Sequence, residues 1–234
     1  MQVYRHLVSD DKVSKNLPEK IIKRDLEEKK RRRLSLEGYQ QIWRYARPSI
    51  RSAMELSLNL LQRRADIGKL RFDDLKDDGY VYIIQQKTRK HGKSAYLRIP
   101  ANLPIVHSEG AKKTVGELIL ACRDDVPCPF VIHERPERFR SSVEKEHWAQ
   151  LSRKQISDGF ADARDASGFY EELPAGERPS FHELISLGEH LFERLGWSVD
   201  AIQRIRGHTS ARMTKHYLDG HEWTTVEMPA TAKK

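Results

Sequence analysis

The sequence predicts an α+β fold that is mainly helical, with one small antiparallel β-sheet. Most of the chain between residues 35 and 220 repeats apolar residues at the three- and four-residue spacing of amphipathic helices. One segment, residues 79–100, instead carries two runs of β-forming residues around a polar, glycine-containing loop, which is typical of a hairpin. No internal repeat is visible. We therefore expect a helical domain with a small sheet inserted near its start.

Helices are expected first on the N-terminal side of the hairpin. Ser35 is a suitable N-cap for a helix that the Pro48–Ser49 pair ends. A second helix follows over residues 49–62, with its apolar residues on one side. The stretch "RRADIGKLRFDDL", residues 63–75, predicts a further short helix before the hairpin begins.

After the hairpin, helical spacing alternates with turn signals. The expected helices cover residues 113–124, 152–168, 182–196, 198–208 and 210–220. Ser152 is a suitable cap and Gly168 a suitable stop for the second of these helices. Residues 124–147 are rich in proline and charge, so we predict a loop there with one short strand near residues 130–132.

The composition excludes several classes of protein. Of the 234 residues, 38% are hydrophobic and 32% are charged, and no run approaches the ~18 apolar residues of a membrane helix. The N-terminal residues have no apolar stretch after a basic start, so a signal peptide is not expected. The two cysteines, Cys122 and Cys128, form no CxxC pair. We expect a reduced, cytoplasmic protein without a membrane segment or a structural metal.

The charge favours a polyanionic partner. The formal net charge is +8, and cations cluster in "KKRRR" (29–33) and "KTRKHGK" (87–93). Local clusters of this kind favour nucleic acid over a merely basic surface. The candidate DNA-binding residues are Lys29, Lys30, Arg31, Arg32, Arg33, Arg89, Lys90 and Lys93. Residues 1–33 are predicted to be a charged linker, which either follows a DNA backbone or serves as a solvated tether.

Five short pieces of sequence carry a more specific signal. In order they are "LLQRRADIGKLRFDDL" (60–75), "QQKT" (85–88), "HELI" (182–185), "RGHTS" (206–210) and "HYLDG" (216–220). Together, in this order and spacing, they resemble the catalytic domain of tyrosine recombinases, in particular phage integrases of the lambda type. The resemblance covers about residues 34–228, and it implies the tyrosine-recombinase catalytic fold.

The resemblance also implies site residues. The positions that match the family's catalytic residues are Arg63, Lys87, His182, His208 and Tyr217, the nucleophile. Tyr217 follows His208 by nine residues, as in those enzymes. Rivals from the residues alone are Arg64 for the arginine, Lys90 and Lys93 for the lysine, and Tyr170 for the nucleophile.

The chemistry explains why these residue types are needed. In-line attack on a phosphodiester builds negative charge on the non-bridging oxygens, which fixed cations and hydrogen-bond donors stabilise. A tyrosine hydroxyl can form a covalent 3′-phosphotyrosyl bond that conserves the bond energy. A lysine near the leaving 5′-oxygen can protonate it. The scheme needs neither a metal nor a cofactor.

One position departs from the family pattern. The arginine of the family's HxxR motif falls on Ile185, and an aliphatic side chain cannot bind a phosphate. Loss of a preorganised donor costs roughly 10²–10³ in rate, so we expect DNA binding with poor cleavage. Arg204 and Arg206 are candidate substitutes. The alternative functions are a recombinase-like domain that binds DNA without cutting it and, less favoured, a type IB topoisomerase.

The family also implies how the chain is organised. We expect residues 1–33 to lead from a missing core-binding domain, residues 34–217 to form the catalytic domain and residues 218–234 to form a tail. In related integrases this tail acts in trans, whereas the other possibility is that it folds back on its own domain. The implied partners are double-stranded DNA with an attachment-type site and further copies of the chain, as a tetramer on DNA in the bacterial cytoplasm.

Overall fold

The computed structural model describes five stretches of the chain between residues 32 and 228. The described residues are 32–86, 96–109, 113–138, 145–207 and 223–228. The chain divides into Met1–Arg31 and Arg32–Lys234, and every described residue belongs to the second unit. None of the described helices is both long enough and apolar enough to cross a bilayer.

The first two helices form where the sequence predicts them. Helix α2 (Leu36–Tyr45) begins at Ser35, whose hydroxyl accepts a hydrogen bond from the Gly38 N–H. Helix α3 (Pro48–Leu60) has Pro48 in its first turn, where the missing proline N–H would have no helical partner anyway. Pro48 therefore starts the second helix rather than ending the first, which stops at Tyr45, three residues earlier.

A three-stranded sheet follows, with strand order β1-β2-β3. Strands β1 (Tyr80–Ile84) and β2 (Tyr96–Pro100) pair antiparallel, which confirms the predicted hairpin and the mainly helical α+β class. Strand β3 (Thr224–Thr225) comes from the C-terminal tail and pairs parallel with β2, which the sequence did not predict.

The tail therefore folds back on its own domain in the single chain. The Trp223 ring packs edge-on against Tyr82 and Tyr96, with centroids 4.6 and 5.1 Å away. Val226 is buried, and its N–H donates to the Arg98 carbonyl oxygen. Packing of this tail on a neighbouring subunit was the other expectation, and for an assembly on DNA it stays a prediction.

Shorter elements complete the fold. They are α4 (Arg64–Ile67), the 3-10 helix η2 (Phe72–Asp74), α6 (Val115–Leu120), α7 (Arg153–Ala166), α8 (Glu183–Arg194) and α9 (Val199–Ile205). The predicted strand near residues 130–132 is wrong: Phe130 makes only an isolated bridge to Arg71. The prolines and turns around it leave too short an extended stretch for a ladder. The helix predicted over residues 210–220 lies outside the described residues.

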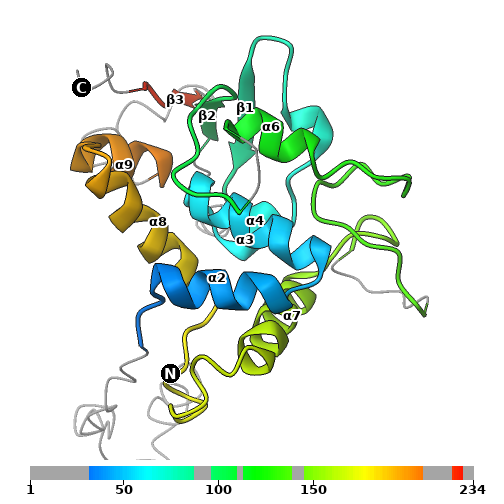
Figure 1. Ribbon diagram of the computed structural model, residues 1–234. Helices are drawn as coiled ribbons and strands as arrows, with labels where there is room; N and C mark the ends of the chain where they lie inside the picture. Colours follow the sequence, from blue (N-terminus) through cyan, green and yellow to red (C-terminus); the bar gives the residue numbers. More distant parts are fainter. Residues whose placement is uncertain (1–31, 87–95, 110–112, 139–144, 208–222, 229–234) are drawn as a thin grey trace, which may run out of the picture. The chain divides into compact units, whose positions relative to one another are not determined.

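Helix α3 is the centre of the hydrophobic core. Figure 1 shows it in the middle of the domain, and α6, α7 and α8 all pack against it. Gly188 allows α8 to approach closely, because a Cβ at this position would overlap the Leu58 carbonyl oxygen of α3. The end of α3 and the first half of α8 are thereby brought together, 130 residues apart in the sequence.

Candidate active site

Arg63 lies just after α3, and its positive charge interacts with the buried Asp66 carboxyl. The side chain is half-buried, and within the described part of the chain it has no hydrogen bond, ion pair or aromatic partner. The other half-buried arginines of the described residues are all engaged, namely Arg51, Arg71, Arg98, Arg164, Arg178 and Arg206. A half-buried cation that the fold leaves unpaired is suited to bind an anionic ligand.

The rival position, Arg64, is occupied by a local contact. Its side chain is exposed, and its Nη1 donates to the Ser157 hydroxyl at 2.5 Å. The two neighbouring arginines therefore differ: Arg64 binds α7, whereas the guanidinium of Arg63 has no such partner.

Asp66 lies one turn after Arg63 and is almost fully buried. One carboxylate oxygen accepts the Gln86 N–H at 2.7 Å, and the other has no hydrogen-bond partner among the residues that the structure describes. Burial raises the pKa of the Asp66 carboxyl, while the hydrogen bond from Gln86 and the charge of Arg63 oppose that rise. The contact attaches α4 to the residue that directly precedes Lys87.

Two buried glutamines join the end of α3 to the end of β1 and to the end of α9. The Gln62 side-chain NH₂ donates to the Ile205 carbonyl oxygen at 2.7 Å, and the Gln85 NH₂ donates to the Gln62 side-chain oxygen at 2.8 Å. The Gln85 NH₂ also donates to the Arg206 carbonyl oxygen at 2.7 Å. We call Gln62, Gln85 and residues 205–207 the glutamine junction.

The glutamine junction brings together the chain segments that lead into three predicted site residues. Arg63 directly follows Gln62, whereas Lys87 and His208 lie outside the described residues, as does Tyr217. Gln62 and Gln85 were not predicted as site residues from the sequence. The available signal was that each glutamine stands one or two residues before a predicted catalytic cation.

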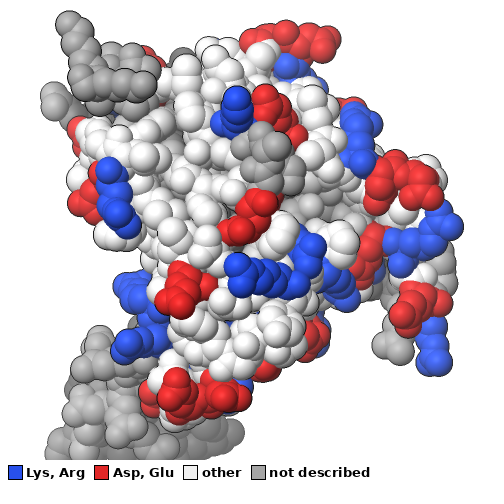
Figure 2. Space-filling model, in the orientation of Figure 1, with Lys and Arg blue, Asp and Glu red and all other residues white. Residues whose placement is uncertain are grey.

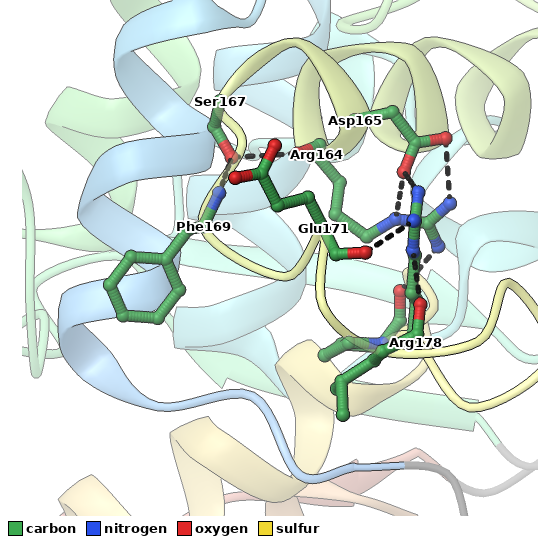
Figure 3. A network of polar contacts seen from close by, with 8 residues as sticks. Arg164, Asp165, Ser167, Phe169, Glu171 and Arg178 are labelled. Atoms are coloured by element: carbon green, nitrogen blue, oxygen red, sulfur yellow. Dashed lines mark hydrogen bonds and ion pairs between the residues drawn. The ribbon is translucent and has the colours of Figure 1, made fainter.

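The chain enters α8 through a loop held by charged groups. Arg164 and Arg178 both donate to the Asp165 carboxylate, at 2.9 Å for the closest pairs. Arg164 also donates to the Pro179 carbonyl oxygen, and Arg178 to the carbonyl oxygens of Leu173 and Glu171. Figure 3 shows the two guanidiniums side by side at this carboxylate. The contacts fix residues 167–179, which precede His182.

His182 and Ile185 occupy different environments at the start of α8. His182 is the exposed N-cap residue, whereas Ile185 is only 3% exposed and belongs to the hydrophobic core. Residues three positions apart on a helix usually share a face. The structure instead places Ile185 three residues before Gly188, on the side of α8 that packs on α3. An apolar residue is stable there because the core excludes water.

The candidate substitute cations are already paired with carboxylates. Arg206 binds Glu189 at 2.5 Å, and Arg204 approaches Glu227 at 3.4 Å. Glu189 lies one helical turn after Ile185, so the Arg206 guanidinium lies near the position that lacks its arginine.

The alternative nucleophile, Tyr170, is a structural residue. It is 7% exposed, and its hydroxyl accepts the Ser35 N–H at 3.2 Å, at the start of α2. The ring also lies directly over Gly38 of α2. Tyr170 thus closes the contact between α2 and the loop after α7, and it is not placed to attack a ligand.

The positive charge is not spread over the described scaffold. Described residues hold 23 of the 42 lysines and arginines and 25 of the 34 aspartates and glutamates, a net charge of −2. On the face in Figure 2, both signs are interspersed. Most of the predicted DNA-binding cations, Lys29, Lys30, Arg31, Arg89, Lys90 and Lys93, lie outside the described residues. Of the two described ones, Arg33 binds Glu183 and the Ser186 hydroxyl, and Arg32 is exposed.

The chain belongs to the phage integrase family, whose model matches residues 32–222. The chain is 32% identical over 203 residues to the integrase of Enterobacteria phage P21, covering 85% of this chain and 49% of that protein. It is 32% identical over 206 residues to the integrase of Escherichia phage lambda, covering 86% and 51%. The chain thus spans about half the length of these curated relatives.

Solved structures agree with the sequence relatives. The lambda integrase catalytic core matches with a TM-score of 0.62 at 28% identity, over 85% of this chain and 100% of that chain. A lambda integrase dimer bound to a COC′ core site matches with a TM-score of 0.68 at 26% identity, over 97% of this chain and 59% of that chain. The mainly helical fold with a small sheet is therefore the fold of the integrase catalytic core.

Proposed function

We propose that this chain is the catalytic part of a site-specific DNA recombinase that integrates DNA at attachment-type sites. The observation that supports it best is Arg63: a half-buried guanidinium that makes no hydrogen bond or ion pair among the described residues, beside a junction that leads into two further predicted catalytic positions. A phosphodiester supplies the missing negative charge.

The proposed reaction is a transesterification. The Tyr217 hydroxyl oxygen attacks the phosphorus, its proton leaves to a neighbouring base, and the bond from phosphorus to the 5′-oxygen breaks. Lys87 gives a proton to the leaving 5′-oxygen. Arg63, His182 and His208 stabilise the charge on the non-bridging oxygens. Attack by the 5′-hydroxyl of another strand reverses the steps and joins the new partner.

Ile185 weakens this site, because one guanidinium is absent. Ground-state binding should depend mainly on the basic segments of residues 29–33 and 87–93, and it should fall with salt and need no divalent ion. A lambda integrase dimer binds a core site and a tetramer binds a Holliday junction. For this chain we propose the same assembly on DNA, in the bacterial cytoplasm. A second candidate, DNA binding without cleavage, is favoured by the buried Ile185 alone.

Covalent capture tests the proposal. The chain is incubated with a nicked suicide duplex carrying an attachment-type site, in EDTA, and protein–DNA adducts are separated under denaturing conditions. We expect a slow adduct that Tyr217→Phe abolishes and that Tyr170→Phe leaves at the wild-type rate per folded molecule. An adduct that survives Tyr217→Phe contradicts the assigned nucleophile. Binding without any adduct, even after Ile185→Arg, supports the second candidate.

A further inference from the structure

The glutamine junction supplies hydrogen-bond donors to backbone carbonyl groups at the C-terminal ends of two helices. Leu60 is the last residue of α3 and Ile205 the last of α9, and the carbonyl groups of a final helical turn have no partner within their own helix. Gln62 donates to both of these carbonyl oxygens, at 2.9 and 2.7 Å. One side chain thus caps the ends of two helices at once.

Gln85 extends this connection to the sheet. Its NH₂ group donates to the Gln62 side-chain oxygen and to the Arg206 carbonyl oxygen. Gln62 is 0% exposed and Gln85 is 2% exposed, so water does not replace these bonds. Only a primary amide of this length both donates two hydrogen bonds and accepts another. A glutamate lacks the donors, and an apolar residue leaves buried carbonyl groups open.

Gly207 fits closely onto the same amides. Its φ of +68° is favourable for glycine alone, and a Cβ there would lie 2.9 Å from both the oxygen and the nitrogen of the Gln85 amide. The turn just before His208 is therefore shaped to lie against Gln85.

We propose that Gln62 and Gln85 are positioning residues of the recombinase site. They hold together the segments that follow α3, β1 and α9. In the sequence, a predicted catalytic residue comes within two residues of each of these segments: Arg63, Lys87 and His208. The inference rests on the proposed function. It assigns a role to neutral, buried side chains that touch no DNA, and it predicts that their loss damages the chemistry more than the binding.

The first test compares Gln85→Met with a matched control, Asn59→Leu. Asn59 is also 0% exposed and also bridges backbone groups, but it joins α3 to residues 106–107, which precede no site residue. Single-turnover adduct formation on the nicked duplex should fall by about 10²-fold per folded molecule in Gln85→Met, because a shift of about 1 Å in a catalytic group costs that much. Asn59→Leu should lower the thermal midpoint without this loss of rate. DNA affinity should stay close to wild type in both.

A sulfur leaving group separates positioning from general destabilisation. A duplex with a 5′-bridging phosphorothiolate needs no proton on the leaving atom, so a displaced general acid no longer limits cleavage. We expect this substrate to restore Gln85→Met toward the wild-type rate. Gln62→Met, which disturbs the turn carrying Arg63, should stay slow on both substrates. If the two variants showed equal defects on both substrates, the assignment of Gln85 to the general acid and of Gln62 to Arg63 would be wrong.

Hydrogen exchange of the full chain tests whether the glutamines hold the junction together, and it does not depend on DNA cleavage. In Gln85→Met the backbone amides of residues 205–207 should exchange at least about tenfold faster, with α7 unchanged, because the junction opens locally. Unchanged exchange at residues 205–207, or a wild-type cleavage rate in Gln85→Met, overturns the proposal. A wild-type chain that forms no adduct on either substrate refutes the proposed function and the catalytic role with it, although the faster exchange would still be seen. The two failures are therefore distinguishable.

Discussion

The glutamine junction and the loop before α8 both hold chain next to predicted site residues, but with opposite chemistry. The junction uses neutral amides that are at most 2% exposed, and their acceptors include the end carbonyls of two helices. The loop uses two arginines around Asp165, whose side chain is 47% exposed. One connection is dry and uncharged, and the other is ionic, with a carboxylate that is open to water.

This difference predicts that the glutamine junction stabilises the fold more than the loop before α8 does. Breaking a buried hydrogen bond leaves a group unsatisfied at a cost of about 1–3 kcal/mol, whereas an exposed ion pair contributes about 0–1 kcal/mol. The two regions also treat cations differently. Arg63, beside the junction, makes no hydrogen bond or ion pair within the described part of the chain, whereas Arg206 is paired with Glu189, and Ile185, the predicted HxxR position, is buried. The α3 side of the site is thus ready for a phosphate, and the α8 side is not.

The largest expected effect comes from restoring the cation on the α8 side. Ile185→Arg should raise the single-turnover rate of adduct formation on a nicked duplex by about 10², because a preorganised donor is regained. Since Ile185 is 3% exposed, the buried cation should also lower the free energy of unfolding by roughly 3 kcal/mol in urea denaturation without DNA. Ile185→Met, which keeps volume and polarity, should change neither quantity by much.

An unchanged rate in Ile185→Arg would mean that another guanidinium already serves. Arg206 is then the first suspect, because its partner Glu189 lies one turn from Ile185. Arg206→Ala would in that case slow the wild type but not Ile185→Arg. Equal rates in all three proteins would contradict a cation requirement on the α8 side.

The next largest effect is expected from a substitution of Gly207, the glycine of the junction. Gly207→Ala should lower the free energy of unfolding by about 2–3 kcal/mol, because φ is +68° and the added Cβ meets the Gln85 amide. Gly196→Ala is the matched control: φ is +84° but nothing lies within 4 Å, so strain alone should cost about 1 kcal/mol. Equal costs in urea denaturation would show that the contact with Gln85 is unimportant.

The third prediction concerns Asp66, a titratable group that is buried near the glutamine junction. Burial raises its pKa, so the folded state favours the protonated form. The stability that protonated Asp66 contributes is fully present below the pKa of an unfolded aspartate, about 3.9. It is lost as the pH rises through the pKa of Asp66 in the folded state. Asp66→Asn should therefore be more stable than wild type by about 1 kcal/mol at pH 7, and equal to it near pH 3. The exposed neighbour Asp73, changed to Asn, should show no such trend in thermal unfolding.

The smallest effect is expected at the solvated loop. Hydrogen bonds from Arg164, and then from Arg178, hold the pKa of Asp165 below its usual value. The resulting stability is present above about pH 4 and is lost as the pH falls through the folded pKa. Asp165→Asn should cost about 0.5 kcal/mol at pH 7, less in high salt and nothing in acid. Asp162→Asn, on the exposed side of α7, is the control. A salt-independent loss above 2 kcal/mol would refute the weak, solvated description.

The sequence by itself determined the local structure, and it predicts which catalytic cation the site lacks. Helix spacing, the caps at Ser35 and Ser152 and the hairpin all depend on residues a few positions apart, so they can be read along the chain. The family motifs marked Arg63 as a site residue and Ile185 as the missing arginine. Neither conclusion needed a long-range contact.

Only the tertiary structure decided which groups are paired. Gln62 and Ile205 meet across 143 residues, and Gln85 and Arg206 across 121 residues. No local pattern encodes such contacts, because they arise when the ends of α3, β1 and α9 pack together. Among the described residues, the same packing leaves Arg63 without a hydrogen bond or ion pair, attaches Arg64 to Ser157 and buries Ile185. Burial and pairing are properties of the packed chain, and they distinguish residues that look alike in the sequence.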